Sequence, residues 1–81
     1  MNRSVSNSFA EWVIDPDPRG FTLFIWVYGA YQVKENLKEL GYQWNRKLKA
    51  WEFSRHSVSE ETLEGEVDIH MVDLRLLGIR V

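Results

Sequence analysis

The stretch from Lys34 to Phe53, KENLKELGYQWNRKLKAWEF, constrains the fold of this chain more than any other. Leu37 and Leu40 follow each other at helical spacing and predict a helix over 30–40 with one apolar stripe. Gly41 suits the left-handed position just after a helix, because it has no side chain to clash there. A helix that ends here leads the chain directly into the aromatic segment that follows.

The aromatic segments on both sides of this helix predict two β-hairpins. Tyr42–Trp44 and Lys49–Phe53 alternate in polarity around a short basic turn. Earlier in the chain, two prolines and a glycine within residues 15–20 predict a turn between strands 9–14 and 21–28. The second of these strands is apolar on both faces. This is typical of a central strand that is covered on both sides, or of one that shows a face to a partner.

The C-terminal segment contains a helix signal and a strand signal. Ser57 or Ser59 can cap a short acidic helix that Gly65 ends. Residues 67–72 alternate in polarity and predict a strand, and 73–81 fit either a strand or a helix. Together the elements predict an α+β fold, with a mostly antiparallel sheet of four or five strands and one main helix packed on one face.

The length and composition predict one small soluble domain. Residues 1–8 are polar and predict a flexible leader, followed by a single domain over 9–81. The chain contains no cysteine, so its stability has to come from a core of aromatic and aliphatic side chains. The N-terminus lacks the apolar stretch of a signal peptide and no segment is long enough to span a membrane, which predicts a cytoplasmic protein.

Charge is distributed unevenly along the sequence. Residues 34–56 contain six Lys or Arg against three Glu, whereas 57–81 contain two Arg against six Asp or Glu. Cations interleaved with aromatic rings suit nucleic acid, because phosphates attract cations and bases stack on flat apolar surfaces. The net charge of −2 argues against strong nonspecific binding. The residues predicted to contact nucleic acid are Lys34, Lys38, Arg46, Lys47, Lys49 and Arg55.

Four aromatic residues are candidates for either the core or a binding surface. Trp44 and Trp51 are predicted mainly as core residues that join the helix to the hairpin, with base stacking as the alternative. Trp26 and Tyr28 share one face of their strand. They belong to the core or form an exposed patch for a base or a protein.

Groups that could perform chemistry are sparse. His56 and His70 are the only histidines, and their spacing matches no metal-binding motif. No phosphate-binding loop or nucleophile motif occurs, and the carboxylates after Ser59 have the pattern of a solvated helix. The sequence therefore predicts a binding function, with no catalytic residues, no metal and no cofactor.

The helix-to-hairpin stretch also resembles a known small domain. Its pattern K-x-x-L-K-x-L-G-x-x-W followed by K-x-W is similar to a domain of uncharacterised function in phage, plasmid and DNA-processing proteins, and to the core of the HARP domain of annealing helicases. The resemblance covers residues 21–55 and implies an accessory α+β module that positions nucleic acid without chemistry of its own. Asn45 replaces an acidic residue common in that pattern, and the acidic stretch after residue 57 has no counterpart in it. The pattern is carried by Lys34, Leu37, Lys38, Leu40, Gly41, Trp44, Lys49, Trp51 and Phe53.

Two functions follow from these observations. The first is a noncatalytic module for single-stranded or forked DNA, or RNA, that contacts the backbone through the basic turn beside aromatic residues. The second is a small phage- or plasmid-encoded interaction module that binds a host enzyme through its aromatic face or its acidic tail. Neither interpretation predicts a membrane partner or a particular oligomeric state.

Overall fold

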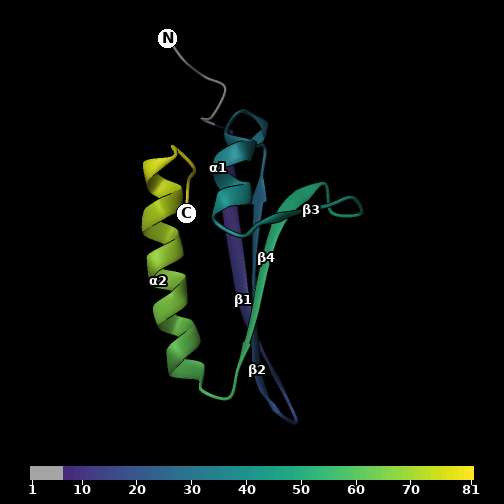
Figure 1. The fold of residues 1–81 in the computed structure, drawn as a ribbon, viewed down its shortest axis with the longest axis vertical. Coiled ribbons are helices and arrows are strands. Elements are labelled where there is room, and N and C mark those ends of the chain that lie inside the picture. Colours follow the sequence, from purple (N-terminus) through teal and green to yellow (C-terminus); the bar gives the residue numbers. More distant parts are fainter. Residues whose placement is uncertain (1–6) are drawn as a thin grey trace.

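The computed structural model describes residues 7–81, which form a four-stranded antiparallel sheet with two α-helices (Figure 1). This confirms the predicted α+β fold class. Residues 1–6 of the predicted leader lie outside the described residues. In chain order the elements are β1 (Phe9–Asp17), β2 (Gly20–Tyr28), a short 3-10 helix η1 (Tyr31–Val33), α1 (Lys34–Glu39), β3 (Gln43–Asn45), β4 (Ala50–Ser57) and α2 (Glu60–Leu76). The strand order in the sheet is β1-β2-β4-β3.

Both predicted hairpins form, and the first has a tighter turn than the sequence indicates. β1 and β2 stay paired as far as Asp17 and Gly20, so only Pro18 and Arg19 connect them. Pro16 lies within β1 although proline has no amide hydrogen. This is possible because β1 is an edge strand, and an amide on its outer side has no neighbouring strand to bond. Gly20 is required by its surroundings: its φ is 144°, and a Cβ would lie 2.5 Å from the Ser57 carbonyl oxygen.

The core lies between one face of the sheet and the two helices. Leu23, Ile25 and Val27 alternate along β2, and all three are completely buried. They form one cluster with Leu37 of α1 and with the inward residues of α2, so both helices cover the same face, here called the helix face. The intervening residues of β2 are only half-buried on the opposite face, here called the open face. The inward residues of α2 are Leu63, Val67, His70, Met71 and Leu74.

The C-terminal helix is the main correction to the sequence prediction. The expected strand over 67–72 is wrong, and Gly65 does not end the helix, because α2 continues through both to Leu76. Its N-cap is Ser59, whose side chain accepts a hydrogen bond from the Thr62 amide at 3.2 Å. The alternation that predicted a strand arises because α2 carries apolar residues on two opposite sides.

The end of α1 has the glycine conformation that the sequence predicts. Gly41 has a φ of 98°, and its amide donates to the Lys38 carbonyl at 3.0 Å. The next amide, of Tyr42, donates to the Leu37 carbonyl at 2.9 Å, which completes a Schellman motif. This motif places Tyr42 in the core beside Leu37, immediately before β3 begins.

The two ends of the described chain meet at the outer edge of β1. The Arg80 amide donates to the Ser8 carbonyl at 3.2 Å, and the Ala10 amide donates to the Arg80 carbonyl at 2.8 Å. Ser8 is completely buried, so the last residue of the predicted leader belongs to the packed structure. Residues 73–81 are expected to be strand or helix, and 73–76 form the end of α2. Residues 78–81 contribute one parallel bridge, between Arg80 and Phe9.

A buried polar contact joins α2 to the start of β3. The Tyr42 hydroxyl lies 2.9 Å from His70 Nδ1, and His70 Nε2 lies 3.6 Å from Glu66 Oε1. A neutral ring with its proton on Nε2 suits both contacts, because Tyr42 then donates to Nδ1. Burial lowers the pKa of His70, against the opposing effect of the Glu66 and Asp73 carboxylates. The ring is therefore neutral at pH 7.

We expect the protein to lose stability as the pH falls below 6.5, the ordinary pKa of histidine. His70 binds a proton more weakly in the folded protein than in the unfolded chain, so acid favours unfolding. His70→Gln leaves a neutral hydrogen-bonding group near Tyr42 and should flatten the pH dependence of thermal melting between about pH 5 and about pH 7. His56→Gln removes the other histidine, whose Nε2 lies 3.7 Å from Asp17 Oδ2, and its melting profile separates the contributions of the two rings. An unaltered profile in His70→Gln would contradict this role.

Candidate functional site

A shallow cavity lies between the α1 region and the β3–β4 hairpin. Its volume is about 260 Å³. The chain forms it by returning sharply at Gly41, which brings β3 back beside the helix that has just ended. Two ammonium groups and three aromatic rings therefore surround one space. The lining residues are Tyr31, Lys34, Lys38, Trp44 and Trp51.

The two tryptophans have different roles in this cavity. They face each other across β3 and β4, with ring centroids 5.3 Å apart and an edge-to-face angle of 63°. Trp51 is only 7% exposed and belongs to the core, as predicted. Trp44 is 49% exposed, so its assignment as a core residue is wrong. β3 is an edge strand of three residues, and this leaves the Trp44 ring half open to solvent beside the lysines.

The cations of the cavity are held by neighbours on their own helical turn. Lys34 Nζ lies 2.7 Å from the Tyr31 hydroxyl and 4.1 Å from the centre of the Tyr31 ring. This hydrogen bond raises the pKa of Lys34 and lowers the pKa of Tyr31. Lys38 forms an exposed ion pair with Glu35, with 3.4 Å between Nζ and Oε2. Tyr31 was not among the predicted site residues, although its position three residues before Lys34 is a signal that could have identified it.

The basic turn, residues 46–49, directly follows β3, whose Trp44 lines the cavity. The Asn45 side-chain oxygen accepts a hydrogen bond from the Leu48 amide at 3.0 Å and holds the turn closed. Lys49 ends the turn with a φ of 54°, a left-handed conformation that favours glycine. Arg46 and Lys49 are each two residues along the chain from a cavity tryptophan. The exposed turn residues are Arg46, Lys47, Leu48 and Lys49.

The remaining predicted residues lie elsewhere. Trp26 is on the open face, where its indole N–H donates to Glu52 at 2.7 Å and its ring stacks on Phe24. Tyr28 shares that face and stacks on Phe9 with 4.8 Å between ring centroids. The structure therefore separates these two residues from Trp44 and Trp51 by the thickness of the sheet. Both side chains are half-buried on the open face, where the Phe24 ring covers Trp26 and the Phe9 ring covers Tyr28.

Arg55 also lies apart from the other cations. Its Nη1 atom is 3.3 Å from Glu66 Oε2, in an ion pair between β4 and α2. Its guanidinium lies 5.7 Å from the centre of the Phe53 ring. These contacts direct Arg55 toward the helix face, whereas the basic turn projects from the opposite end of β4.

The lysine, leucine, glycine and tryptophan pattern of residues 34–51 divides into two groups of positions. Leu37 and Gly41 shape the turn, because one is fully buried and the other takes the left-handed conformation. The lysines and tryptophans of that pattern lie in the cavity or on its adjoining turn. They are Lys34, Lys38, Trp44, Lys49 and Trp51.

The histidines and carboxylates of residues 7–81 are dispersed over the surface and the helix face. Within that range, no group of three or more His, Asp or Glu side chains is placed to hold a metal ion. None of the helices described for this range has the length and apolar character needed to cross a membrane.

Replacing each tryptophan should show which of the two rings stabilises the fold. Trp51→Ala should lower the free energy of unfolding by about 3–5 kcal/mol, the usual cost of removing a buried large aromatic ring. Trp44→Ala should cost only about 1 kcal/mol, because its ring is half exposed. Urea unfolding followed by circular dichroism measures both values. Equal losses in the two variants would show that Trp44 is a core residue after all.

No protein-family model matches the chain, and no curated protein or solved structure matches it either. The resemblance of residues 21–55 to the HARP domain core therefore stays a prediction. The role of the cavity has to follow from the chemistry of the residues that line it.

Proposed function

We propose that the protein is a noncatalytic nucleic-acid-binding module for single-stranded or forked DNA, or RNA. The observation that carries the proposal is the cavity in which Lys34 and Lys38 lie beside Trp44 and Trp51. A nucleotide combines a negatively charged phosphate with a flat base, and this cavity offers a partner for each. The bound nucleic-acid strand would run from the α1 side of the cavity onto the basic turn.

Trp44 is the proposed stacking platform. One part of its ring is exposed, and Trp51 supports it from the buried side in edge-to-face contact. A supported ring loses little conformational freedom when a base stacks on it, which favours affinity. Only an unpaired base can present its face to such a ring, so the proposal specifies single strands, forks or loops rather than intact duplex.

The turn after β3 supplies the proposed backbone contacts. Arg46, Lys47 and Lys49 are exposed and within a few residues of the Trp44 platform. Lys49 occupies a left-handed position where glycine would be less strained. A cation kept at a strained position supports a functional role for that cation, because the fold alone favours glycine there.

The acidic composition of the chain is concentrated away from this surface. α2 contains six carboxylates and a single arginine. In Figure 1, α2 lies at one side of the molecule and the β3–β4 turn projects from the other side. Charges are screened over about 8–10 Å at physiological salt, so a phosphate at the turn responds mainly to the nearby cations. This arrangement supports nucleic-acid binding by a protein of net negative charge.

We expect the purified protein to bind a fluorescent single-stranded or forked oligonucleotide at low salt with modest affinity. If about three phosphates are contacted, log K should fall against log salt with a slope near −2. Arg46→Ala, Lys47→Ala and Lys49→Ala should each weaken binding and flatten the slope, and reversing all three to Glu should abolish it. Trp44→Ala should weaken binding about tenfold through lost stacking. Fluorescence anisotropy measures all of these effects.

Arg75→Ala is the matched control for the binding experiment. Arg75 is an exposed cation on α2, away from the turn, so its removal should leave affinity unchanged. The proposal fails if the parent protein gives no anisotropy change at low salt. It also fails if the triple reversal binds as well as the parent, in which case the turn is only a solvated rim.

Replacing Lys49 with glycine should raise the stability of the fold and lower the affinity for an oligonucleotide. Lys49→Gly should raise the free energy of unfolding by roughly 0.5–1 kcal/mol, because glycine relieves the left-handed strain at some entropic cost. Lys49→Ala keeps that strain and should not stabilise the protein. Both variants lose the cation and should weaken oligonucleotide binding equally. Thermal melts and anisotropy test this pair, and undiminished binding by Lys49→Gly would show that the lysine has no role in contact.

A further inference from the structure

The solvent side of α2 carries a second apolar stripe. Ile69, Val72 and Leu76 are 63%, 51% and 81% exposed, although they belong to a helix packed on the sheet. Their spacing of three and four residues places them along one line of the helix, directly opposite the buried stripe. Thr62 and Gly65 continue the same spacing toward the N-terminus. In Figure 1 α2 lies at one side of the molecule.

Carboxylates flank this apolar stripe on both sides. Glu61 and Asp68 follow one side of it, where Arg75 continues the row, and Glu66 and Asp73 follow the other, where Glu66 is paired with Arg55. Arg75 is the single cation of α2. The apolar part of this surface, from Ile69 to Leu76, is therefore about 10 Å long at 1.5 Å per helical residue, and carboxylates lie on both sides of it. A bound helix needs such a line for its own apolar residues, spaced in the same way.

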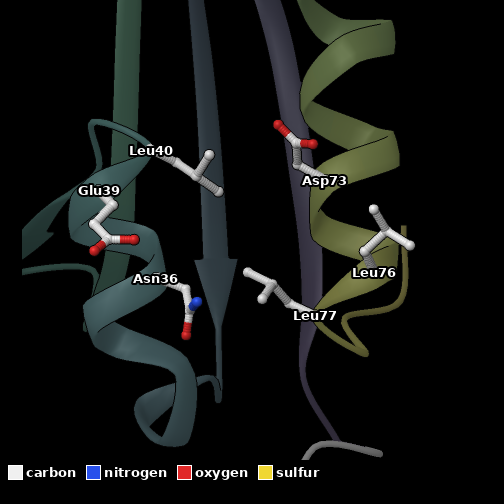
Figure 2. A pocket seen from close by; sticks show the side chains of 6 residues that line it. All are labelled: Asn36, Glu39, Leu40, Asp73, Leu76 and Leu77. Atoms are coloured by element: carbon white, nitrogen blue, oxygen red, sulfur yellow. The ribbon is translucent and has the colours of Figure 1, made fainter.

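A notch between α1 and α2 extends this surface at its C-terminal end. Its volume is about 220 Å³, and Leu76, the last residue of the stripe, lies at its edge. Figure 2 shows Leu40 and Leu77 pointing into the gap between the two helices. Glu39 and Asp73 also line the notch. Leucines beside carboxylates suit a long basic side chain, because its apolar stem packs on the leucines and its charged group pairs with the carboxylates.

We propose that the outer face of α2 binds an amphipathic helix with basic flanks, supplied by another protein. The apolar residues of that helix would lie along Ile69, Val72 and Leu76. Its Lys or Arg residues would face the two acidic rows, and one of them would enter the notch. A Cβ placed on Gly65 would meet no atom within 4 Å, so this position leaves space for a large apolar side chain of the partner.

Charge decides between this partner and the other candidates. A second copy of the chain would place most of these carboxylates against one another, because Arg75 is the one cation among them, and like charges there are repulsive. Nucleic acid is excluded from this face for the same reason, because its phosphates would meet carboxylates. The acidic flanks instead attract a cationic helix and speed its association. This surface is separate from the cavity between α1 and β3, so the two proposals can fail independently.

The test uses two synthetic helical peptides of the same length as α2, in the absence of nucleic acid. Both carry leucine and isoleucine at heptad spacing, but one has lysine and arginine at the flanking positions and the other has glutamate. The basic peptide should bind the full chain saturably in fluorescence anisotropy, more weakly as salt rises, and the acidic peptide should not bind. Amide shifts in nuclear magnetic resonance spectra should map the contact to α2 and the notch.

Variants of the protein locate the contact. The triple variant Ile69→Gln/Val72→Gln/Leu76→Gln should bind the basic peptide at least about tenfold more weakly. It should keep the helix, because glutamine is a good helix former. Glu61→Gln/Asp68→Asn should weaken binding less and flatten its salt dependence. Val58→Gln, at a residue that is 80% exposed but outside α2, is the matched control and should change nothing.

Several results would overturn the proposal. One is the absence of saturable binding by the basic peptide up to about 1 mM. Equal binding of the acidic peptide would show that the flanking charges do not select the partner. Unchanged affinity in the triple glutamine variant would place the contact elsewhere. A chain that self-associates in sedimentation experiments, and becomes monomeric in the triple variant, would make a second copy the occupant.

Discussion

The buried row Leu23, Ile25 and Val27 on β2 is the interaction on which the rest of the structure depends. Both helices pack on this row, and all three side chains are completely removed from solvent. An 81-residue chain supplies one layer of helices, so only one face of the sheet is covered in the part that the structure describes. On the open face, aromatic residues reduce their contact with solvent by stacking on each other, as Phe24 and Trp26 do. Two exposed rings, Tyr31 and Trp44, and two lysines then gather at the cavity beside β3, and exposed aliphatic residues and carboxylates lie along the outside of α2.

These two surfaces have opposite electrostatic character, and the fold keeps them apart. The turn after β3 is basic and α2 is acidic, with the sheet between them (Figure 1). Because screening limits the reach of each surface to about 10 Å, each can attract a partner of opposite charge without strongly repelling the other partner. On the two proposals together, the protein would hold a nucleic-acid strand on one side and a basic helix on the other. The near-neutral total charge of the chain conceals this separation.

The sequence predicted the middle of the chain well because its signals there are local. The helix stop at Gly41 and the hairpin that follows depend on neighbours within a few residues, and both are confirmed. The strand expected over 67–72 is wrong because Ile69 and Val72 interrupt the apolar periodicity of α2, and that segment contains no other local signal for a helix or a strand. Pairings between distant residues could not be predicted. Arg55 was grouped with the basic turn, and only the packing of α2 on β4 reveals its ion pair with Glu66.

The contact of Arg80 with Ser8 and Ala10 has a consequence for how the chain can be rearranged. The two hydrogen bonds bring the ends of the described chain together at one edge of the sheet, so its path is nearly a closed ring. A short linker between these ends would span little distance, and new termini could open at the exposed Pro18–Arg19 turn, where only two residues connect β1 to β2. Such a circular permutant would keep every strand pairing and both helices. It would also move the chain ends to the far tip of the first hairpin, beside the residues that lead into α2 and away from the cavity.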